Sequence, residues 1–460
     1  MLLEGLLDLY EKSDEYAKRR APGTGNPTGS ALGKCAAALQ LLRWPAHSNP
    51  ESLSARAVMG FEEGDDVEAR MLARAKQVYG DRLVGSEQAL AYWPVPVMPE
   101  QAALITERMA LGYGEPGAVW GRVARGFRPP RVRVREEDAK AVVTPSWPII
   151  VTRKTGFVLD PEAGRLWVPV FIDFALRHPT LGPHIAEIKA VSEFEFRRAL
   201  LGEFSYQKRA QLAAIVDATG LSAFLLMQRK NTQHVIEISY SPSVQGKVRV
   251  RILLNTRREE VFLIDAGQPV RENGEGAWPA DEEWTFGEVW TPYDPAILAE
   301  CRERVLRVLT WDPTQEPYRE YGPAPFTCEK CAGAGRVLCK QCKGTGETPK
   351  TKKACGPCGG AKTVACELCG ATGNITERAI AQMPCGYCSV KMACFAKVGI
   401  EKRFIVGRYG PKPAWVIGRE AWEKAGLTIH TPPSLAVPSG LALAELPPDG
   451  AAPAPEAVEP

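Results

Sequence analysis

The order of apolar and polar residues along the chain predicts helices first and a strand-rich region after them. Apolar residues recur with the period of one helix face over 33–44 and 57–80. Shorter apolar runs, alternating or continuous, indicate strands over 166–176, 185–191, 223–230, 234–240, 247–255 and 259–265. This succession is typical of an α/β domain.

Helical patterns also lie among and after the strands. One predicted helix covers 192–219 and ends before Gly220, a residue type that commonly follows a helix. An amphipathic pattern predicts another helix over 295–311, in which Cys301 is expected to be a core thiol. We expect helical structure to resume after residue 376. The pattern therefore predicts an α/β core in which strands and helices alternate.

Composition places the chain among globular proteins. Of its 460 residues, 45% are apolar and 24% are charged, which excludes a disordered chain, a collagen and a coiled coil. A net charge of +3 says little about partners. No apolar run approaches the roughly 20 residues of a membrane span, and the N-terminus carries acids where a signal peptide carries bases. A cytoplasmic location is therefore expected.

The cysteine distribution divides the chain further. Eleven of the 13 cysteines lie between Cys328 and Cys394, and the others are Cys35 and Cys301. In a large chain without a signal peptide, cysteines more often bind metal than form disulfides. We expect a helical region, an α/β core, a cysteine-rich module, a C-terminal region and a disordered tail rich in proline and alanine. Their boundaries are 1–80, 81–311, 326–373, 376–430 and 431–460.

Charged residues on two adjacent predicted strands form the strongest catalytic pattern. Asp173 lies on one strand, and Glu187 and Lys189 project from the same face of the next. If the strands pair, two carboxylates meet in a site suited to Mg²⁺ or Mn²⁺, and the lysine can order a water or steady charge on a phosphate. An ordinary Glu/Lys pair on a surface strand is the alternative. Glu68 and Gln211, each on a predicted helix, extend the pattern.

This order of residues resembles the PD-(D/E)XK nuclease superfamily, and within it the branch of RecB-like, AddB-like, CRISPR-adaptation and phage exonucleases. The resemblance implies a restriction-endonuclease-like core, which is a mixed central sheet flanked by helices. It also implies the metal ligands Glu68, Asp173 and Glu187, the catalytic lysine Lys189, and Gln211 to place substrate or water. The chain departs from the family in three respects. Isoleucine, Ile172, and not proline, precedes Asp173, as is common in this branch. Glu68 stands where many relatives have histidine, and Ile215 stands where tyrosine is usual.

A second cysteine set is split between the two ends of the predicted core. Cys385, Cys388 and Cys394 are one ligand short of a tetrahedral set, and Cys35 is the candidate fourth. One cysteine before a nuclease core and three after it resemble the iron–sulfur staple of AddB and the CRISPR-adaptation nucleases, which implies a structural 4Fe–4S cluster. A third zinc site is one alternative. A buried, apolar Cys35 with some other fourth ligand is another.

Four C-x2-C pairs, each followed by glycines, predict a metal-binding module between the core and that set. Their C-x-x-C-x-G-x-G repeat, from which the third copy departs with Ala361-Lys362, resembles the zinc domain of DnaJ-type co-chaperones. The resemblance implies a zinc-binding β-hairpin module with two Zn²⁺ ions. The outer ligands would be Cys328, Cys331, Cys366 and Cys369, and the inner ligands Cys339, Cys342, Cys355 and Cys358.

Basic residues offer candidate contacts with DNA. A first group, next to Trp120 and Phe127, has the mixed basic and aromatic character that suits nucleic acid: Arg122, Arg125, Arg128, Arg131, Arg133 and Arg135. A second lies at the tip of the cysteine-rich module: Lys343, Lys350, Lys352 and Lys353. A third lies on the predicted helix over 192–219: Arg197, Arg198, Tyr206, Lys208 and Arg209. A solvated surface without a ligand is the alternative for each.

These patterns together predict a Mg²⁺- or Mn²⁺-dependent DNA nuclease. The resemblance favours exonuclease action on DNA ends or single strands in recombination, repair or phage DNA metabolism, with recombination or replication proteins as partners. It implies the bacterial cytoplasm, or the host cytoplasm if a phage encodes the protein. A non-catalytic nucleic-acid-binding zinc protein is one alternative. A zinc co-chaperone is another, although the chain has no His-Pro-Asp tripeptide of a J-domain.

Overall fold

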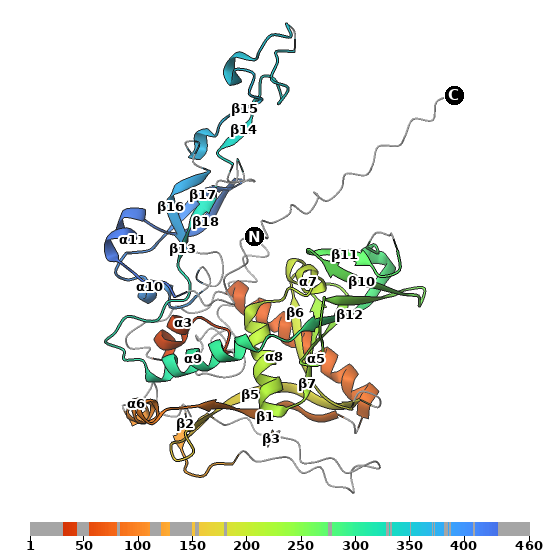
Figure 1. The fold of residues 1–460 in the computed structure, drawn as a ribbon, viewed down its shortest axis with the longest axis vertical. Helices are drawn as coiled ribbons and strands as arrows, with labels where there is room; N and C mark the ends of the chain where they lie inside the picture. The colour runs from red at the N-terminus through yellow and green to blue at the C-terminus, as the bar shows by residue number, and fades with distance from the viewer. Residues whose placement is uncertain are drawn as a thin grey trace.

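The computed structural model describes residues 31–43, 55–80, 83–110, 121–128, 150–151, 156–178, 182–274, 278–327, 331, 334–349, 351–369, 371, 373–380, 385, 388–407 and 410–430. Figure 1 shows a body built on one large sheet, a smaller sheet beside it and a narrow projection at one end. The tail over 431–460, which is expected to be disordered, lies outside the described residues. No helix within the described ranges is long and apolar enough to span a bilayer.

One sheet of 12 strands organises the body. Its strands are β1 (Leu83–Pro96), β2 (Gly121–Val123), β3 (Ile150–Val151), β4 (Phe157–Asp160), β5 (Arg165–His178), β6 (Gly182–Val191), β7 (Ser222–Arg229), β8 (Val235–Ser241), β9 (Arg249–Leu254), β10 (Glu259–Asp265), β11 (Gln268–Arg271) and β12 (Trp284–Pro292). Their order is β11-β10-β9-β12-β8-β7-β6-β5-β1-β3, and β4, paired with β2, branches at β5. Because β6–β7 and β12–β8 are parallel while β5–β6 and β1–β5 are antiparallel, the predicted mixed sheet is confirmed.

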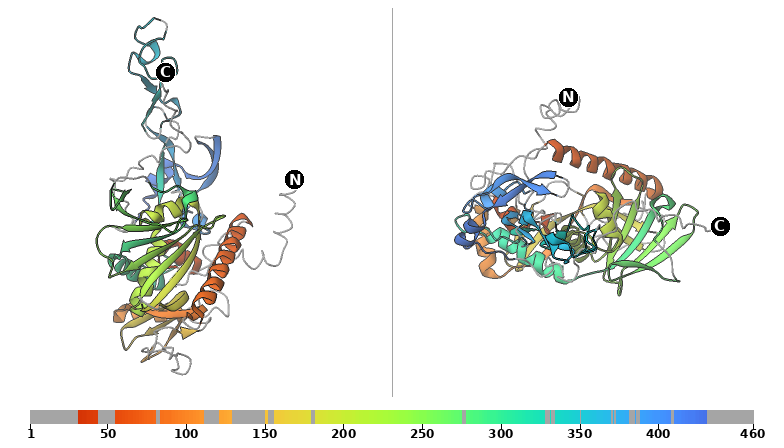
Figure 2. Two further views of the ribbon diagram at one scale, coloured as in Figure 1. Left: turned by 90° about the vertical axis from the view of Figure 1, so that its right-hand side faces the viewer. Right: turned by 90° about the horizontal axis from the view of Figure 1, so that it is seen from above.

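Helices lie on both faces of this sheet, as the two views of Figure 2 make visible. They are α3 (Ala36–Arg43), α5 (Ala55–Tyr79), α6 (Pro99–Ala110), α7 (Glu193–Leu200), α8 (Tyr206–Thr219) and α9 (Ala296–Thr310), with a short 3₁₀ turn η4 (Asp281–Glu283) before β12. On one face, α8 and α9 pack into the main core, where Cys301 is fully buried as expected. On the other face, α5 packs through Leu72 onto Phe174 and Ile188. The sheet is thus a layer between helices, with α5 packed against β6 on one face.

The helix predicted over 192–219 is two helices, so that expectation is wrong in one respect. α7 ends at Leu200, and α8 begins at Tyr206 behind its N-cap Ser205. Between them Gly202 has φ +78°, and a Cβ at this position would lie 2.5 Å from Cγ2 of Val248. A side chain there would both strain the backbone and collide with the strand region behind it, so glycine is needed at this break.

The C-terminal region is built mainly of strands, so the expectation of helix after residue 376 holds for two short helices and is otherwise wrong. Its four-stranded sheet contains β13 (Pro323–Thr327), β16 (Asn374–Ile380), β17 (Glu401–Gly407) and β18 (Gly410–Ile417) in the order β13-β16-β18-β17. The helices are short, α10 (Lys391–Cys394) and α11 (Arg419–Ala425). β-branched and aromatic residues in 404–406 and 415–417 favour the paired strands β17 and β18 over a helix.

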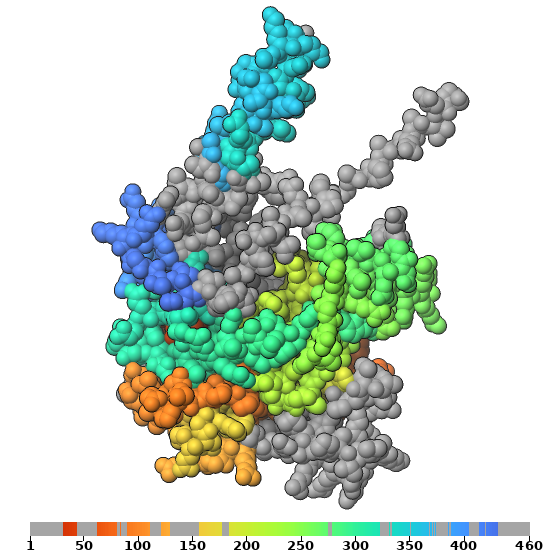
Figure 3. Space-filling model, viewed as in Figure 1, coloured from red at the N-terminus to blue at the C-terminus, as the bar shows by residue number. Residues whose placement is uncertain are grey.

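The cysteine-rich module is inserted between β13 and β16. Within it β14 (Arg336–Leu338) and β15 (Thr363–Ala365) pair as an antiparallel hairpin, as expected, and two 3₁₀ turns follow cysteines, η5 (Gly356–Cys358) and η6 (Glu367–Cys369). Figures 1 and 3 show this part projecting away from the body. We name residues 331–369 the cysteine arm.

A buried ion pair joins the N-terminal segment to the body. Nε of Arg304 on α9 donates to the two carboxylate oxygens of Glu320 at 2.8 and 3.0 Å. Glu320 also accepts the backbone N–H of Ala36 at 2.7 Å. Arg304 donates further to the carbonyl of Leu32 at 2.7 Å and to the hydroxyl of Tyr206 at 3.1 Å. The start of α3, the start of α8 and the segment after α9 are therefore held at one point.

Two carboxylates lie side by side where β8 and β12 pair. Glu237 is opposite Glu288 in the register, and Arg251 on β9 donates to Glu288 at 2.5 and 2.8 Å. Burial, and then the charge of Glu288, raise the pKa of Glu237 to about 7 although Arg251 acts the other way. A carboxyl group with a raised pKa stabilises the folded state below its ordinary pKa, and this stabilisation is lost as the pH rises through the raised value.

We therefore expect Glu237→Gln to raise the free energy of unfolding relative to wild type by roughly 1–3 kcal/mol at pH 8, and by little at pH 4. Urea unfolding at the two pH values measures the difference. Glu367→Gln, at an exposed position of the cysteine arm, controls for the loss of one charge. An effect of Glu237→Gln that is equal at both pH values would contradict the prediction.

Candidate metal and catalytic sites

Three carboxylates converge on one lysine at the middle of the large sheet. Nζ of Lys189 lies 2.7 Å from Glu187 Oε1, 3.4 Å from Glu68 Oε1 and 3.7 Å from Asp173 Oδ2. Glu187 and Lys189 come from β6, Asp173 from β5, and Glu68 from α5. The structure thus brings together four residues that the sequence pattern assigns to one site.

Asp173 is placed where β5 and β6 stop pairing. The antiparallel register runs from His178↔Gly182 to Phe174↔Ala186 and ends there. Beyond it, Oδ2 of Asp173 accepts the backbone N–H of Ile188 at 2.7 Å, in the place of a main-chain carbonyl. The register of β1 against β5 also shifts on both sides of Phe174. Irregular pairing of this kind re-aims side chains, and here it directs Asp173 toward Lys189.

Glu68 is held over β6 by the packing of its helix. The apolar cluster that contains Leu72 with Phe174 and Ile188 seats α5 on the sheet one turn after Glu68. An ion pair of 3.1 Å between Glu63 and Lys230, which follows β7, fixes the preceding turn. Contacts on both sides therefore position the Glu68 carboxylate.

Gln211 reaches the same site from α8, which packs on the face of the large sheet opposite to α5. It is buried on α8, and its Nε2 donates to Oε1 of Glu187 at 2.5 Å. The amide therefore orients one oxygen of Glu187. The placing of substrate or water by Gln211, which the family resemblance implies, stays a prediction.

Negative charge exceeds positive charge in this site. Three carboxylates and one ammonium sum to −2 when all four groups are ionised. Burial, and next the charge of Asp173, raise the pKa of Glu187 well above its ordinary value. Burial also raises the pKa of Glu68, an effect that Lys189 opposes and Asp173 reinforces. Burial acts to lower the pKa of Lys189, but the carboxylates outweigh it and raise that pKa, so the side chain stays an ammonium.

The residues present fit a divalent cation. Oε2 of Glu187 is buried and has no hydrogen-bond partner within the described part of the chain. Carboxylate oxygens are the ligands that Mg²⁺ and Mn²⁺ prefer, and two positive charges would balance the excess of negative charge. A cation held by Glu68, Asp173 and Glu187 would therefore satisfy both the free oxygen and the charge.

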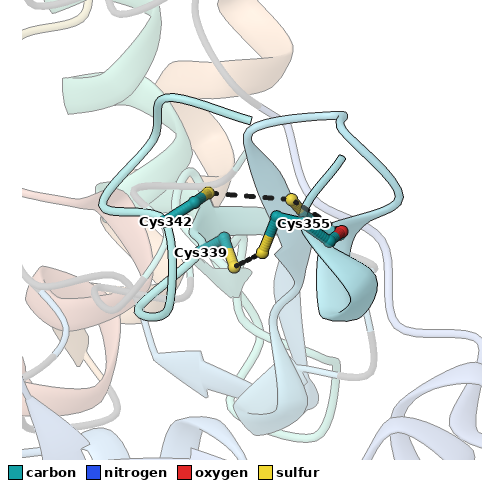
Figure 4. Close-up of side chains that lie close together, drawn as sticks. Cys339, Cys342 and Cys355 are labelled. Atoms are coloured by element: carbon teal, nitrogen blue, oxygen red, sulfur yellow. Dashed lines mark hydrogen bonds between the residues drawn. The ribbon is translucent and has the colours of Figure 1, made fainter. Parts of the chain in front are cut away.

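Four inner cysteines of the arm form a compact group that can hold a metal ion (Figure 4). The Sγ atoms of Cys339 and Cys355 are 3.7 Å apart, as are those of Cys342 and Cys358, and all four lie within 4.8 Å of one another. Bonds of about 2.3 Å to a tetrahedral zinc ion separate two sulfurs by about 3.8 Å. The N–H of Gly346 also donates to the sulfur of Cys342 at 3.4 Å. This geometry is compatible with zinc.

A second compact group lies at the base of the arm. The sulfurs of Cys331, Cys366 and Cys369 lie within 4.8 Å of one another, with 3.7 Å between Cys331 and Cys369. Cys328, the fourth member of the predicted outer set, lies outside the described residues. The sulfurs are thus grouped as the sequence assigns them, and this group too can hold a metal ion.

The split cysteine set meets where the N-terminal segment contacts the C-terminal region. Cys35, Cys385 and Cys394 belong to one buried cluster, and Cys388 packs against it. Burial, followed by the charges of Cys35, Cys394 and Cys388, raises the pKa of Cys385. We refer to these four residues as the cysteine quartet. Among the described residues, the quartet is not one of the groups whose sulfurs all lie within 4.8 Å.

Similarity to known proteins does not assign a function to these residues. No family model, curated protein or solved structure matches the chain. The resemblance to PD-(D/E)XK nucleases therefore stays a prediction, and the geometry and chemistry of the sites have to support any function.

The arginine-rich segment is only partly described. The guanidinium of Arg122 lies over the ring of Phe127 at 5.6 Å, and Arg125 is 3.3 Å from Glu162. Both arginines are exposed, as is Arg128. The other residues of this candidate surface lie outside the described ranges: Trp120, Arg131, Arg133 and Arg135.

The candidate DNA contacts on α7 and α8 are occupied by contacts within the protein. Tyr206 is buried, and its hydroxyl donates to Glu300 at 2.9 Å and accepts from Arg304, so its assignment to a DNA surface is wrong. Arg209 is half-buried. The remaining three side chains form ion pairs: Arg197 with Glu193, Arg198 with Glu203, and Lys208 with Glu195.

Sequence reasoning missed the polar residues that support the quartet. Arg319 is buried and donates through Nε and Nη2 to the carbonyl of Cys394 at 3.0 and 2.8 Å. Its neighbour Glu320 binds the N–H of Ala36, the residue after Cys35. Adjacent arginine and glutamate residues are common on surfaces, so nothing in the sequence indicates that this pair is buried.

Proposed function

We propose that the protein is a Mg²⁺- or Mn²⁺-dependent nuclease that hydrolyses phosphodiester bonds in DNA. The observation that carries this proposal is the convergence of Glu68, Asp173 and Glu187 on the ammonium of Lys189, at 3.4, 3.7 and 2.7 Å. Such a set can bind a divalent cation and a phosphate together. A restriction-endonuclease-like core, which the family resemblance implies, is part of the same proposal.

Each residue of the site would have its own role in hydrolysis. A cation held by Glu68, Asp173 and Glu187 supplies polarisation of a phosphoryl oxygen and a lowered pKa of bound water. Lys189 donates hydrogen bonds to the phosphate or the attacking water and stabilises the negative charge that develops there. Gln211 holds Oε1 of Glu187, and Oε2 would be the oxygen that binds a cation.

Labelled DNA in linear, end-blocked, circular and single-stranded forms tests this function. With Mg²⁺ or Mn²⁺ the protein should degrade linear DNA, and EDTA should stop the reaction. Loss of free-ended DNA with survival of end-blocked and circular DNA would support exonuclease action. If every DNA form, and RNA, stays intact with either cation, the proposal is overturned.

We propose Zn²⁺ as the ion of both groups in the cysteine arm, because thiolates at tetrahedral spacing select zinc over hard cations.

Cys355→Ser is then expected to remove about one zinc ion per chain and to leave the unfolding temperature of the body unchanged. The reason is that the arm is inserted between β13 and β16 and projects away from the body (Figure 1). Metal analysis and thermal unfolding measure the two quantities. Cys301→Ala, outside the arm, should keep all the zinc, and a large fall in the unfolding temperature with Cys355→Ser would contradict this independence.

We also propose that the cysteine quartet holds a 4Fe–4S cluster. Its sulfurs are more widely spread than those of the arm, and a four-iron cluster is wider than a single ion. Bound cysteines on both sides of the α/β core would close a loop that contains the whole core and so reduce the entropy of the unfolded chain.

Iron analysis of protein purified without oxygen tests the cluster. We expect a brown protein with about four irons per chain, and Cys394→Ser should lose the iron while keeping the zinc of the arm. A colourless preparation in which zinc replaces iron in the quartet would overturn the cluster and favour a third zinc site.

A further inference from the structure

The cysteine arm and its flanks are rich in basic residues. Residues 328–373 include eight lysines and arginines against three acidic residues. Figure 3 shows the arm standing clear of the body, where a large ligand can approach it. Five of its lysines are described and exposed: Lys340, Lys343, Lys352, Lys353 and Lys362.

The ammonium groups of these five lysines form no ion pair with any residue that the structure describes. Lysines of the body differ in this respect, since Lys247 lies 2.8 Å from Asp265, and Lys230 lies 3.1 Å from Glu63. Like charges gathered on a small module repel one another, and a polyanion would relieve that repulsion.

Three lysines of the arm also occupy backbone conformations that favour glycine. Lys343, Lys352 and Lys362 have φ of 49°, 57° and 66°. Lys362 follows the third C-x2-C pair at the position where the other three pairs have glycines with positive φ, Gly335, Gly346 and Gly373. A lysine is less favourable than glycine in this conformation. Its presence therefore indicates a use for the side chain, since folding alone would be served better by glycine.

We propose that the cysteine arm binds the phosphate backbone of DNA through these lysines. This inference rests on the proposed function, because it assigns the arm to the same DNA that the nuclease site would cut. The buried sulfurs of Cys339, Cys342 and Cys355 hold the loops from which the lysines extend, so the positive charges stand on an ordered scaffold. Contacts of this kind read no base sequence, which suits an enzyme that degrades DNA of any sequence.

Fluorescence anisotropy with a labelled DNA duplex, in the absence of divalent cations, measures binding without cleavage. A variant with Lys343→Gln, Lys352→Gln, Lys353→Gln and Lys362→Gln should bind more weakly. The slope of log affinity against log salt should also become shallower by about 0.9 for each lysine that contacts a phosphate. The matched control removes four exposed lysines outside the arm, Lys247, Lys397, Lys402 and Lys424, and should keep the salt slope of the wild type.

The variant Lys362→Gly distinguishes the loss of a contact with DNA from the loss of the folded structure of the arm. Glycine suits a φ of 66°, so this variant should hold zinc and resist heat at least as well as the wild type. It should nevertheless bind the duplex more weakly, with a salt slope lower by about one. Improved stability together with weaker binding is the result that supports the proposal most directly.

Two outcomes overturn the proposal. One is an unchanged affinity and salt slope in the four-lysine variant with its zinc retained. The other is binding of polyglutamate but not of DNA, which would indicate an acidic protein partner. Cleavage assays on the same proteins keep the two proposals apart. If the wild type cleaves DNA but the arm variants bind DNA as well as the wild type, only the role of the arm is rejected. If binding depends on the arm but the wild type never cleaves, only the nuclease is rejected.

Discussion

Lys189→Ala is expected to lower the rate of Mg²⁺-dependent DNA cleavage by about 10²–10⁴-fold. The ammonium lies within 3.7 Å of all three carboxylates, so it is the positive group that would meet a phosphate bound beside the cation. Removing it also removes a charge that opposes cation binding. The affinity for Mn²⁺, measured by calorimetry, should therefore rise while cleavage falls.

The opposite changes in these two quantities separate catalysis from folding. A misfolded variant would lose both cation binding and cleavage. Lys247→Ala removes an exposed lysine that is paired with Asp265 on β10, away from the acidic site, and it should retain most of the activity. If Lys189→Ala cleaves DNA within about tenfold of the wild-type rate, Lys189 is not the catalytic lysine.

Glu320→Ala is expected to reduce the free energy of unfolding by about 3–5 kcal/mol, because it leaves the guanidinium of Arg304 buried without its counter-charge. The same change leaves the N–H of Ala36 without its acceptor. Both residues of the pair are at most 3% exposed, so water cannot easily replace the carboxylate. Urea unfolding followed by circular dichroism measures the loss.

The double variant Arg304→Met, Glu320→Met provides the sharper comparison. With neither charge of this pair left in the interior, it should be more stable than Glu320→Ala, even though it lacks more polar contacts. Arg197→Ala, which breaks an exposed pair with Glu193, should cost less than about 1 kcal/mol. A double variant that is less stable than Glu320→Ala would show that the hydrogen bonds of the pair matter more than its charge.

The strands of the large sheet and the placement of Glu187 beside Lys189 could be predicted because these patterns are local. Side chains of a strand alternate between faces, so the spacing of Glu187 and Lys189 is enough to place both on one side of β6. The grouping of the arm cysteines follows from repeated short turns in the same way. For Glu187 and Lys189, and for the two cysteines of each C-x2-C pair, the placement follows from neighbours a few positions away.

Other features depend on contacts that no local pattern carries. The break between α7 and α8 is set by Gly202 against Val248, which is remote in the sequence. Tyr206 lies in a polar stretch that suggests a surface position, but its hydroxyl is bound by Arg304 and Glu300 of α9. β16, which follows the cysteine arm in the chain, pairs with β13, which precedes the arm. Tertiary contacts decide these outcomes, and a single sequence does not reveal them.

The point at which the cysteine arm departs has a practical consequence. Thr327 and Asn374 face each other in the β13–β16 register, so the arm leaves and returns across the width of a single strand pair. A two-residue loop such as Asn-Gly can span that width. Excision of the arm should accordingly yield a shorter protein with an intact sheet, and the excised hairpin should be transplantable onto any β-turn of another protein.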